Sequence, residues 1–428
     1  MSKVKVTKIQ AREILDCRWA PTVQVDVWVN DEYAGSGNVP AGRSTGSNEA
    51  KELRDGEKRY AGLGVQKAVK NVNEVIAPAL IGMDVTEQRR IDEKLIQLDG
   101  TSNKSNLGAN AIMPVSLAVA YAAANTLGLP LYRYLNPNAH ILPVPLLNLL
   151  NGGKLTSNDL DFQEFCIFPI GAETFKQSME IGHAVNCELY EIVLSRYGKL
   201  ACNTGDEGGF ATPITDVMEA MEVLSLAVER SGYANKIVYG FDCAATHLYD
   251  KETKLYTIQG EKMTTDDVIS FFKDMMKKYP IASIEDPLDE DDIEGFKKIK
   301  QELGIQIIGD DLFCTNPELM KPRIEAGAAN ALLWKFNQVG SLSQAIDAAN
   351  LAYRSGYGIM VSERSGETED SAIADLVVAL DAGQIKTGAG VRSERTAKYN
   401  RLLQIEEQLG SLARYAGKDF ANPYKISF

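Results

Sequence analysis

Short apolar segments, each ending in a charged residue, recur along the C-terminal two thirds of the sequence. They end at six residues that are separated by 43, 25, 25, 28 and 23 positions: Asp242, Glu285, Asp310, Lys335, Glu363 and Lys386. One strand, one helix and two loops take about 30 residues, since a barrel of eight such units has roughly 250. The spacing therefore predicts that six successive strands bring a charge to the same edge of one sheet.

The apolar segments also indicate how the sheet is covered. They read FQEFCIF, KIVYGFD, PIASIED, IQIIGDD, ALLWKF, GIMVSER and GQIKTG, with amphipathic stretches long enough for helices between them. Such runs predict parallel strands that helices cover on both faces. The charges that end these runs favour an α/β fold of the (β/α)8 TIM-barrel type, because active sites are built at the C-terminal rim of such a barrel. An open doubly wound sheet is the alternative.

The first third of the sequence has a different pattern. Thr22 to Val29 alternates as a half-buried strand does, and helical patterns run from about Glu49 to Leu127. The segment LNPNAHILPVP then interrupts the pattern. A chain of 428 residues exceeds the usual size of one domain. We therefore expect an α+β capping domain over residues 1–140 and the barrel over 141–428.

Composition excludes several classes of protein. The net charge is -13 and no long Lys/Arg block is present, so neither nucleic acid nor an anionic membrane is an expected partner. The six cysteines form no C-x-x-C pair, as in a reduced cytoplasmic protein, and zinc is not expected. The N-terminus lacks the apolar core of a signal peptide. The longest apolar stretch, residues 108–130, carries polar residues and predicts a buried helix.

Three of the strand-end residues are carboxylates. Asp242, Glu285 and Asp310 would repel one another in a partly dry cleft unless a cation lay among them. Oxygen ligands favour Mg²⁺, or Mn²⁺, over zinc or copper. The alternative is three exposed acids in an acidic protein.

Two lysines and two glutamates are candidates for proton transfer. Lys335 and Lys386 end apolar runs, and a lysine near a metal and another ammonium has a lowered pKa that suits a general base. The alternative is ion pairing with the neighbouring acids. Glu207, in NTGDEGGF, becomes a proton donor if burial or Glu164 raises its pKa; otherwise the segment is a glycine turn.

Arg364 and Ser365 follow the GIMVS run. A guanidinium and a hydroxyl side by side suit a phosphate or a carboxylate. The alternative is a salt bridge from Arg364 to Glu363, Glu367 or Glu369.

Nearly the whole chain resembles the enolases (phosphopyruvate hydratases). The matching segments are AREILD, GANAI, SLAVA, NGG, QEF, GDEGGF, YPIASIEDPLDEDD, DDLF, SGETEDS, IADL, GQIKTG and RSERTAKYNRLLQIEE. The resemblance implies a small α+β N-terminal domain, a modified barrel and usually a homodimer. It also implies the magnesium-dependent, reversible dehydration of 2-phosphoglycerate to phosphoenolpyruvate, in which a Lys or His base works with one or two Mg²⁺ ions.

The resemblance further implies the metal ligands. Asp242, Glu285 and Asp310 would hold the first Mg²⁺, and Ser44, in the PAGRSTG loop, would join a second Mg²⁺ that comes with the substrate.

It implies the remaining roles as well. Lys335 would remove the proton α to the carboxylate, while Glu207, hydrogen-bonded with Glu164, would assist departure of the hydroxyl. The substrate would be bound by four further residues: Lys386 at its carboxylate, Gln163 along the site, and Arg364 with Ser365 at its phosphate.

The chain departs from the enolase pattern in four loops. The family reads P-S-G-A-S-T-G where this chain has Ala41 and Arg43, and S-R-G-N-P where it has CRWAP. Both family histidines are missing: S-H-A becomes Lys154, Leu155 and Thr156, and S-H-R-S carries Glu363 in place of His.

These changes leave open what Glu363 does. It either pairs with Arg43 or Lys154, the cations on adjacent loops, or binds a donor group of a different substrate. All three residues are therefore candidate substrate-binding residues.

Three functions are consistent with the sequence. The first is an enolase with a rebuilt lid, and the second is a paralogue that acts on a related phospho- or phosphono-carboxylate. The third is a non-catalytic scaffold. The retained Lys335, Lys386 and Glu207 disfavour it, because a scaffold has no evident need of buried charges.

Overall fold

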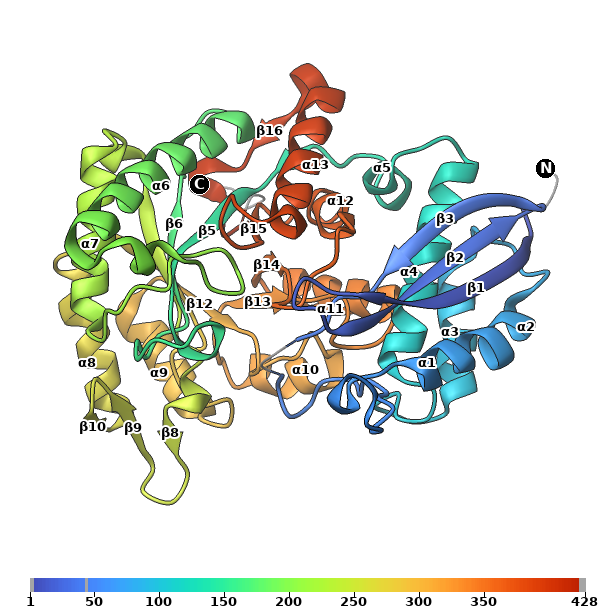
Figure 1. The fold of residues 1–428 in the computed structure, drawn as a ribbon, viewed down its shortest axis with the longest axis horizontal. Helices are drawn as coiled ribbons and strands as arrows, with labels where there is room; N and C mark the ends of the chain where they lie inside the picture. The colour runs from blue at the N-terminus through green and yellow to red at the C-terminus, as the bar shows by residue number, and fades with distance from the viewer. Residues whose placement is uncertain (1–3, 43–44, 423–428) are drawn as a thin grey trace.

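The computed structural model describes residues 4–42 and 45–422, which form an N-terminal unit beside a closed barrel (Figure 1). The N-terminal unit contains an antiparallel sheet of three strands in the order β1-β2-β3: β1 (Val6–Leu15), β2 (Pro21–Val29) and β3 (Glu32–Asn38). The predicted strand from Thr22 to Val29 is confirmed as β2.

Helices cover this sheet and continue the chain toward the barrel. They are α1 (Gln66–Asn71), a π-helical turn (Val72–Ile76), α2 (Ala77–Leu80), α3 (Gln88–Asp99), α4 (Ala109–Thr126) and α5 (Leu131–Leu135). Helix α4 is the buried helix that the apolar stretch predicted. A Cβ on Gly35 or Gly37 of β3 would lie 2.5 or 2.7 Å from a backbone nitrogen of α4, so only glycine permits this close packing.

The predicted start of the helical region at Glu49 is wrong. The segment before α1 has little regular secondary structure, and its backbone bonds to other parts of the chain: Ala50 N–H donates to the Gln338 carbonyl (2.8 Å) and Lys51 N–H to the Asn103 carbonyl (2.8 Å). Because these groups are satisfied by long-range partners, a local helix has no advantage here.

Eight strands close the barrel in the order β5-β6-β7-β11-β12-β13-β14-β15. Their bounds are β5 (Val144–Asn151), β6 (Glu164–Phe168), β7 (Val238–Asp242), β11 (Ile281–Glu285), β12 (Gln306–Gly309), β13 (Ala331–Trp334), β14 (Gly358–Ser362) and β15 (Gln384–Lys386). The predicted α/β class and barrel are confirmed, and the open sheet is excluded.

The barrel differs from the prediction in one missed strand and in the direction of another. Strand β5 was not among the predicted runs, because Pro143 and Pro145 made its segment resemble a linker. Strand β6 is antiparallel to both neighbours, β5 and β7. The connection between β5 and β6 contains only a short 3₁₀ turn, and a parallel return needs a longer crossover.

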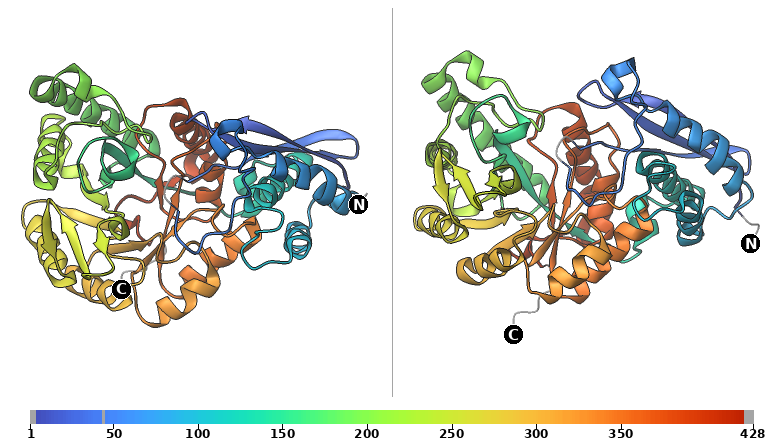
Figure 2. Two further views of the ribbon diagram at one scale, coloured as in Figure 1. Left: turned by 60° about the horizontal axis from the view of Figure 1, so that its bottom comes forward. Right: turned by 90° about the horizontal axis from the view of Figure 1, so that it is seen from below.

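Helices surround the barrel, and the N-terminal unit packs against one side of it (Figure 2). They are α6 (Phe175–Tyr197), α7 (Val217–Arg230), α8 (Thr265–Met276), α9 (Ile293–Leu303), α10 (Pro317–Glu325), α11 (Leu342–Arg354), α12 (Ala372–Ala379) and α13 (Ser393–Leu409). The N-terminal α3 and α4 contact α11, and α5 contacts α12. None of the helices within the described ranges is long and apolar enough to cross a membrane.

Short strands complete the fold. A three-stranded sheet lies between β7 and α8 in the chain, formed by β8 (Tyr249–Asp250), β9 (Leu255–Ile258) and β10 (Glu261–Met263). A two-stranded sheet pairs β4 (Ile141–Leu142) with β16 (Arg414–Tyr415).

Alternation along the strands decides which side chains enter the barrel. In β13, Ala331 and Leu333 belong to a small apolar cluster, whereas Leu332 and Trp334 pack in the large core shared with the helices. Strand residues alternate between two faces, so Lys335 continues the inward set. By the same alternation, Arg364 is on the inward face with Met360, and Glu363 is on the outward face with Ile359 and Val361.

Candidate active site

The six strand-end charges lie at one rim of the barrel, as predicted. Asp242, Glu285 and Lys386 are the last residues of their strands, and Asp310, Lys335 and Glu363 directly follow theirs. Glu164 joins them because β6 runs in the opposite direction, so that its first residue pairs with Asp242. A pocket at this rim is lined by Leu155, Gln163, Glu164, Glu207, Asp242, Lys335, Ser362, Glu363, Arg364, Ser365 and Lys386.

Lys386 is the centre of the pocket's charge network. Its Nζ donates to Glu164 Oε1 (2.9 Å), Asp242 Oδ2 (3.0 Å) and Glu285 Oε2 (2.8 Å), and all four side chains are buried. Burial alone would lower the pKa of Lys386, but these carboxylates, Asp242 foremost, raise it well above its usual value. Lys386 is therefore a permanent cation.

Lys335 is paired rather than free. Its ammonium donates to Asp310, and Gln338 holds the other oxygen of that carboxylate at 2.9 Å. We expected a lowered pKa for Lys335, and the structure shows the opposite. Although burial lowers it, the charge of Asp310 raises the pKa of Lys335 to about 12. The ion-pair alternative is thus correct for this arrangement of the site.

Two acids, Glu164 and Glu207, also line the pocket. Glu207 Oε2 accepts a hydrogen bond from Asn148 Nδ2 (3.2 Å), and Glu164 accepts from Lys386. The expected hydrogen bond between Glu207 and Glu164 is not present among the described side chains. Burial, and then the charge of Glu207, raises the pKa of Glu164 well above its usual value. Glu164 therefore tends to keep its proton.

Arg364 has a partner that the sequence did not suggest. Its Nη1 and Nη2 lie 2.9 and 3.1 Å from the two carboxylate oxygens of Glu49, in the N-terminal unit. The predicted alternative, a salt bridge from the Arg364 guanidinium to Glu363, Glu367 or Glu369, is wrong. The hydrogen bond from Arg364 to Glu367 comes from the backbone N–H (3.0 Å), not from the guanidinium.

Ser365 also touches the N-terminal unit. Arg18 Nη1 lies 3.5 Å from the Ser365 hydroxyl, so both Arg364 and Ser365 contact the N-terminal part of the chain.

The partners of Glu363 among the described residues do not include Lys154, one of the two cations that we expected; the other, Arg43, lies outside the described residues. Glu363 Oε2 accepts hydrogen bonds from Arg395 of α13 and from the Thr387 hydroxyl (3.0 Å). Arg395 also donates to the carbonyls of Arg364 (2.8 Å) and Ser365 (2.8 Å). The outward position of Glu363 in the alternation explains this partner, because α13 packs outside the barrel.

The remaining predicted residues differ in where they lie. Gln163 donates from Nε2 to Asp242 Oδ2 (3.1 Å) and lines the pocket. Lys154 is exposed, and its neighbour Leu155 lines the pocket instead. Arg43 and Ser44 lie outside the described residues.

The predicted metal ligands fit Mg²⁺ in their chemistry. Asp242, Glu285 and Asp310 offer only oxygen atoms, the donors that Mg²⁺ prefers. Glu285 Oε1 is buried and has no hydrogen-bond partner within the described ranges, as expected of an oxygen that awaits a cation. At present Lys386 and Lys335 neutralise these carboxylates.

Two acidic residues near these ligands, Asp286 and Asp311, were missed. Within the described part of the chain, one set of three acids has carboxylate oxygens that all lie within 4.8 Å of one another: Asp286, Asp310 and Asp311. Asp286 accepts hydrogen bonds from the backbone N–H groups of Asp310 (3.0 Å) and Asp311 (2.9 Å), and so it orients the loop that carries Asp310. The doubled acids in SIEDP and GDDLF were the available signal.

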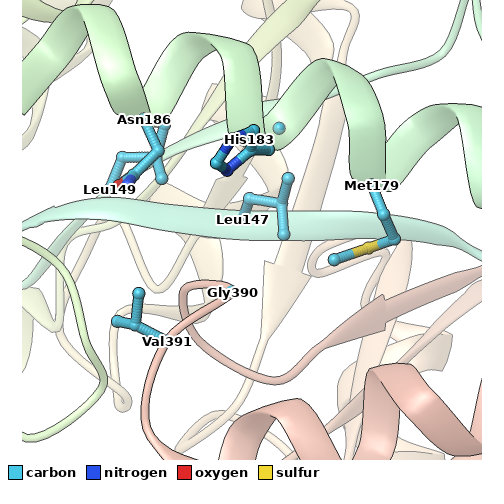
Figure 3. Close-up of a pocket in the computed structure, with 8 residues that line it drawn as sticks. Leu147, Leu149, Met179, His183, Asn186, Gly390 and Val391 are labelled. Atoms are coloured by element: carbon cyan, nitrogen blue, oxygen red, sulfur yellow. The ribbon is translucent and has the colours of Figure 1, made fainter.

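A second, mainly apolar pocket lies outside the charged site (Figure 3). Leu147 and Leu149 of β5 form one wall, helix α6 forms another, and the loop at Gly390 and Val391 closes it. It contains none of the predicted site residues.

Comparison with known proteins agrees with this geometry. The family model for the enolase N-terminal domain matches residues 6–135, and that for the enolase C-terminal TIM barrel domain matches residues 139–424. The enolase of Methanococcus vannielii is 56% identical over 421 residues, which cover 98% of this chain and 99% of the relative.

Two other relatives are similar to the same extent. The enolase of Pyrococcus furiosus is 55% identical over 97% of this chain and 98% of the relative, and that of Methanocaldococcus jannaschii is 52% identical over 99% of both. With matches to both domains over nearly the full length, the chain belongs to the enolase family of lyases.

Proposed function

We propose that this chain catalyses the reversible dehydration of 2-phosphoglycerate to phosphoenolpyruvate. The observation that carries the proposal is a single pocket lined by both cationic and acidic side chains. Lys335, Lys386 and Arg364 supply cations for an anionic substrate, and Glu164 and Glu207 supply acids for the hydroxyl that leaves. A reaction that removes a proton and a hydroxyl from adjacent carbons needs a base and an acid that are held apart.

Lys335 is the proposed base. To accept a proton it must first lose one, and its contact with Asp310 opposes that loss. Any cation that takes over the Asp310 carboxylate therefore lowers the pKa of Lys335, because the ammonium loses its counter-ion, and the neutral amine that can accept a proton becomes easier to form. Lys386 stays charged and is the proposed partner of the substrate carboxylate.

Glu207 is the proposed acid, with Glu164 beside it. Asn148 fixes the Glu207 carboxyl by donating to it, and Glu164 keeps a proton next to it. The two residues thus provide a proton in the pocket that Lys335 also lines.

Asp242, Glu285 and Asp310 are the proposed ligands of Mg²⁺. The ion would supply positive charge that stabilises the substrate carboxylate when it gains a further negative charge. A second Mg²⁺ held with the substrate and Ser44 is a proposal that rests on the family resemblance alone. The same resemblance supports a small phosphorylated carboxylate as the substrate, a homodimer or higher homo-oligomer, and a cytoplasmic location.

A second candidate is a paralogue that acts on a related phospho- or phosphono-carboxylate. Leu155 and Glu363 favour it, because both line the pocket at positions where the family has histidine. These residues change the part of the pocket that contacts the end of the substrate, while the metal ligands and lysines are kept.

Purified protein with Mg²⁺ and 2-phosphoglycerate tests the proposal through the absorbance of the enol product. We expect turnover that falls by roughly 100-fold or more in Lys335→Ala, since a general base contributes about that much. Lys298→Ala, at an exposed lysine, is the control and keeps turnover. Absence of turnover together with tight binding of a phosphonate in the presence of Mg²⁺ supports the paralogue instead.

A further inference from the structure

The two oxygens of the Glu363 carboxyl have unequal surroundings. Oε2 accepts hydrogen bonds from Arg395 and Thr387, whereas Oε1 is buried and has no hydrogen-bond partner among the described residues. A buried carboxylate oxygen without a donor is costly. A proton on Oε1 removes the buried charge, leaves Oε2 free to accept from both partners, and makes Oε1 a donor that still needs an acceptor.

Oε1 lies on the Glu207 side of the carboxyl. A Cβ built on Gly388 would be 3.0 Å from Glu363 Oε1 and 2.5 Å from the Glu207 carbonyl oxygen, so the two oxygens flank the same glycine. Glu363 and Glu207 also line the same pocket. Oε1 is therefore near the backbone of Glu207, the residue proposed as the acid, and the charge of Glu207 also acts on Glu363.

The charges that face Glu363 come from three elements. Helix α13 contributes Arg395 and Tyr399, the loop before α7 contributes Glu207, and the loop of Glu363 itself contributes Glu367. Burial raises the pKa of Glu363 most, Arg395 lowers it, and Glu207 and Glu367 raise it, to about 8 in all. A raised pKa favours the neutral carboxyl near neutral pH more than in an ordinary glutamate.

We infer that Glu363 is a specificity-determining residue that acts as a neutral carboxylic acid and donates a hydrogen bond from Oε1 to an acceptor oxygen of the substrate beside Glu207. The inference rests on the proposed function and defines the substrate further. A hydroxyl or phosphoryl oxygen at this end of the substrate is accepted, and an ammonium group is not, because it has no lone pair to accept the bond. A neutral histidine at the same position also donates, so the replacement keeps a donor in the pocket.

Two substitutions distinguish a Glu363 side chain that donates a hydrogen bond from one that accepts it. In Glu363→Gln the amide oxygen must face Arg395 and Thr387, which places the NH₂ group where the proton on Oε1 was. We expect this variant to keep turnover of 2-phosphoglycerate at neutral pH. Glu363→Leu has no donor and should lower kcat by roughly 100-fold, as loss of one pocket donor does. If Gln is as damaging as Leu, the pocket needs an ionised acceptor and the inference fails.

The pH dependence gives a second test. The ratio of kcat/KM between wild type and Glu363→Gln should fall as pH rises past about 8, because only Glu363 loses its donor by ionising. Glu222→Gln is the control, since Glu222 pairs with the surface residue Arg196 and does not line the pocket. A ratio that is constant with pH contradicts the inference, and so does full activity in Glu363→Leu.

A readout without turnover keeps this inference separate from the proposed function. In protein with isotope-labelled Glu carboxyls, the NMR signal that disappears in Glu363→Gln should titrate near pH 8. If wild type does not turn over 2-phosphoglycerate, the proposed function fails while this titration still reports the proton on Glu363. A signal that titrates at the usual pH for glutamate overturns the inference even in an active enzyme.

Discussion

Glu49 and Arg364 form a buried two-point ion pair that joins the N-terminal unit to the rim of the active site. The guanidinium nitrogens lie 2.9 and 3.1 Å from the two carboxylate oxygens, and the side chains are 9% and 3% exposed. Asn337 accepts a further bond from Arg364 and donates to the Pro40 carbonyl (3.0 Å). An arginine held in this way can meet an anion without reorganising, because its orientation is already fixed.

Replacing Glu49 with Ala should destabilise the protein by about 3–5 kcal/mol, since it leaves a buried guanidinium without its partner. Urea unfolding measures this difference. Asp347→Ala is the matched control: Arg89 and Asp347 also form a two-point pair between the N-terminal unit and the barrel, but both side chains are exposed. Exposed pairs contribute about 1 kcal/mol or less. Equal losses in the two variants would show that burial of the Glu49 pair has no special weight.

Replacing Lys386 with Met should make stability depend on magnesium. Without the ammonium, Glu164, Asp242 and Glu285 repel one another, so the melting temperature should fall in EDTA. Mg²⁺ should restore more of it than in wild type, because the ion then provides the missing positive charge. Scanning fluorimetry with and without Mg²⁺ measures both effects.

Lys398→Met is the control for this experiment. Lys398 is fully buried and pairs with Glu367 (3.0 Å), away from the pocket. It should therefore lose stability that Mg²⁺ does not restore. Rescue of both variants to the same extent would mean that the ion acts elsewhere.

The strand-end charges were predictable because period and spacing are local properties of the sequence. Six positions closed apolar runs, and all six lie at one rim. The alternation of side chains in the run before Glu363 also predicts that Glu363 points outward, since Ile359 and Val361 point outward. That count was available from the sequence and would have pointed to a partner outside the barrel.

The partners themselves were not predictable, because they come from distant parts of the chain. Glu49 and Arg364 are separated by 315 positions, and Glu363 and Arg395 by 32. Nothing in the loop around Glu49 distinguishes it from other exposed acids. Strand β5 was missed for a different reason, since two prolines outweighed its apolar residues.

Stability should reveal the proton on Glu363. A carboxyl with a raised pKa binds its proton more tightly when folded, so its contribution is complete below the unfolded pKa and is lost as pH rises toward about 8. The stability of Glu363→Gln relative to wild type should therefore increase between pH 5 and pH 8. Urea unfolding at several pH values measures it.

Glu394→Gln should show the opposite dependence. Although burial raises it, the hydrogen bond from Arg392 holds the pKa of Glu394 below its usual value. The stability from Glu394 is present above the unfolded pKa and is lost as pH falls, so the difference from wild type changes only in acid. The same trend in both variants would indicate a general effect of pH rather than these two groups.

Replacing Gly388 with Ala should lower kcat while the fold is kept. Gly388 has φ +74°, and an added Cβ would lie 2.5 Å from the Glu207 carbonyl oxygen, so the loop that carries the proposed acid must move. A displacement of about 1 Å can cost roughly 100-fold in rate. Gly356→Ala is the matched control, because its φ is +75° and nothing lies within 4 Å of the added atom. Both variants carry the same backbone strain, so a difference in kcat with a similar melting temperature reports the positions of Glu207 and of Glu363, whose Oε1 would lie 3.0 Å from the added Cβ. Equal activity in the two variants would mean that this loop tolerates the shift and that Glu207 does not need its present place.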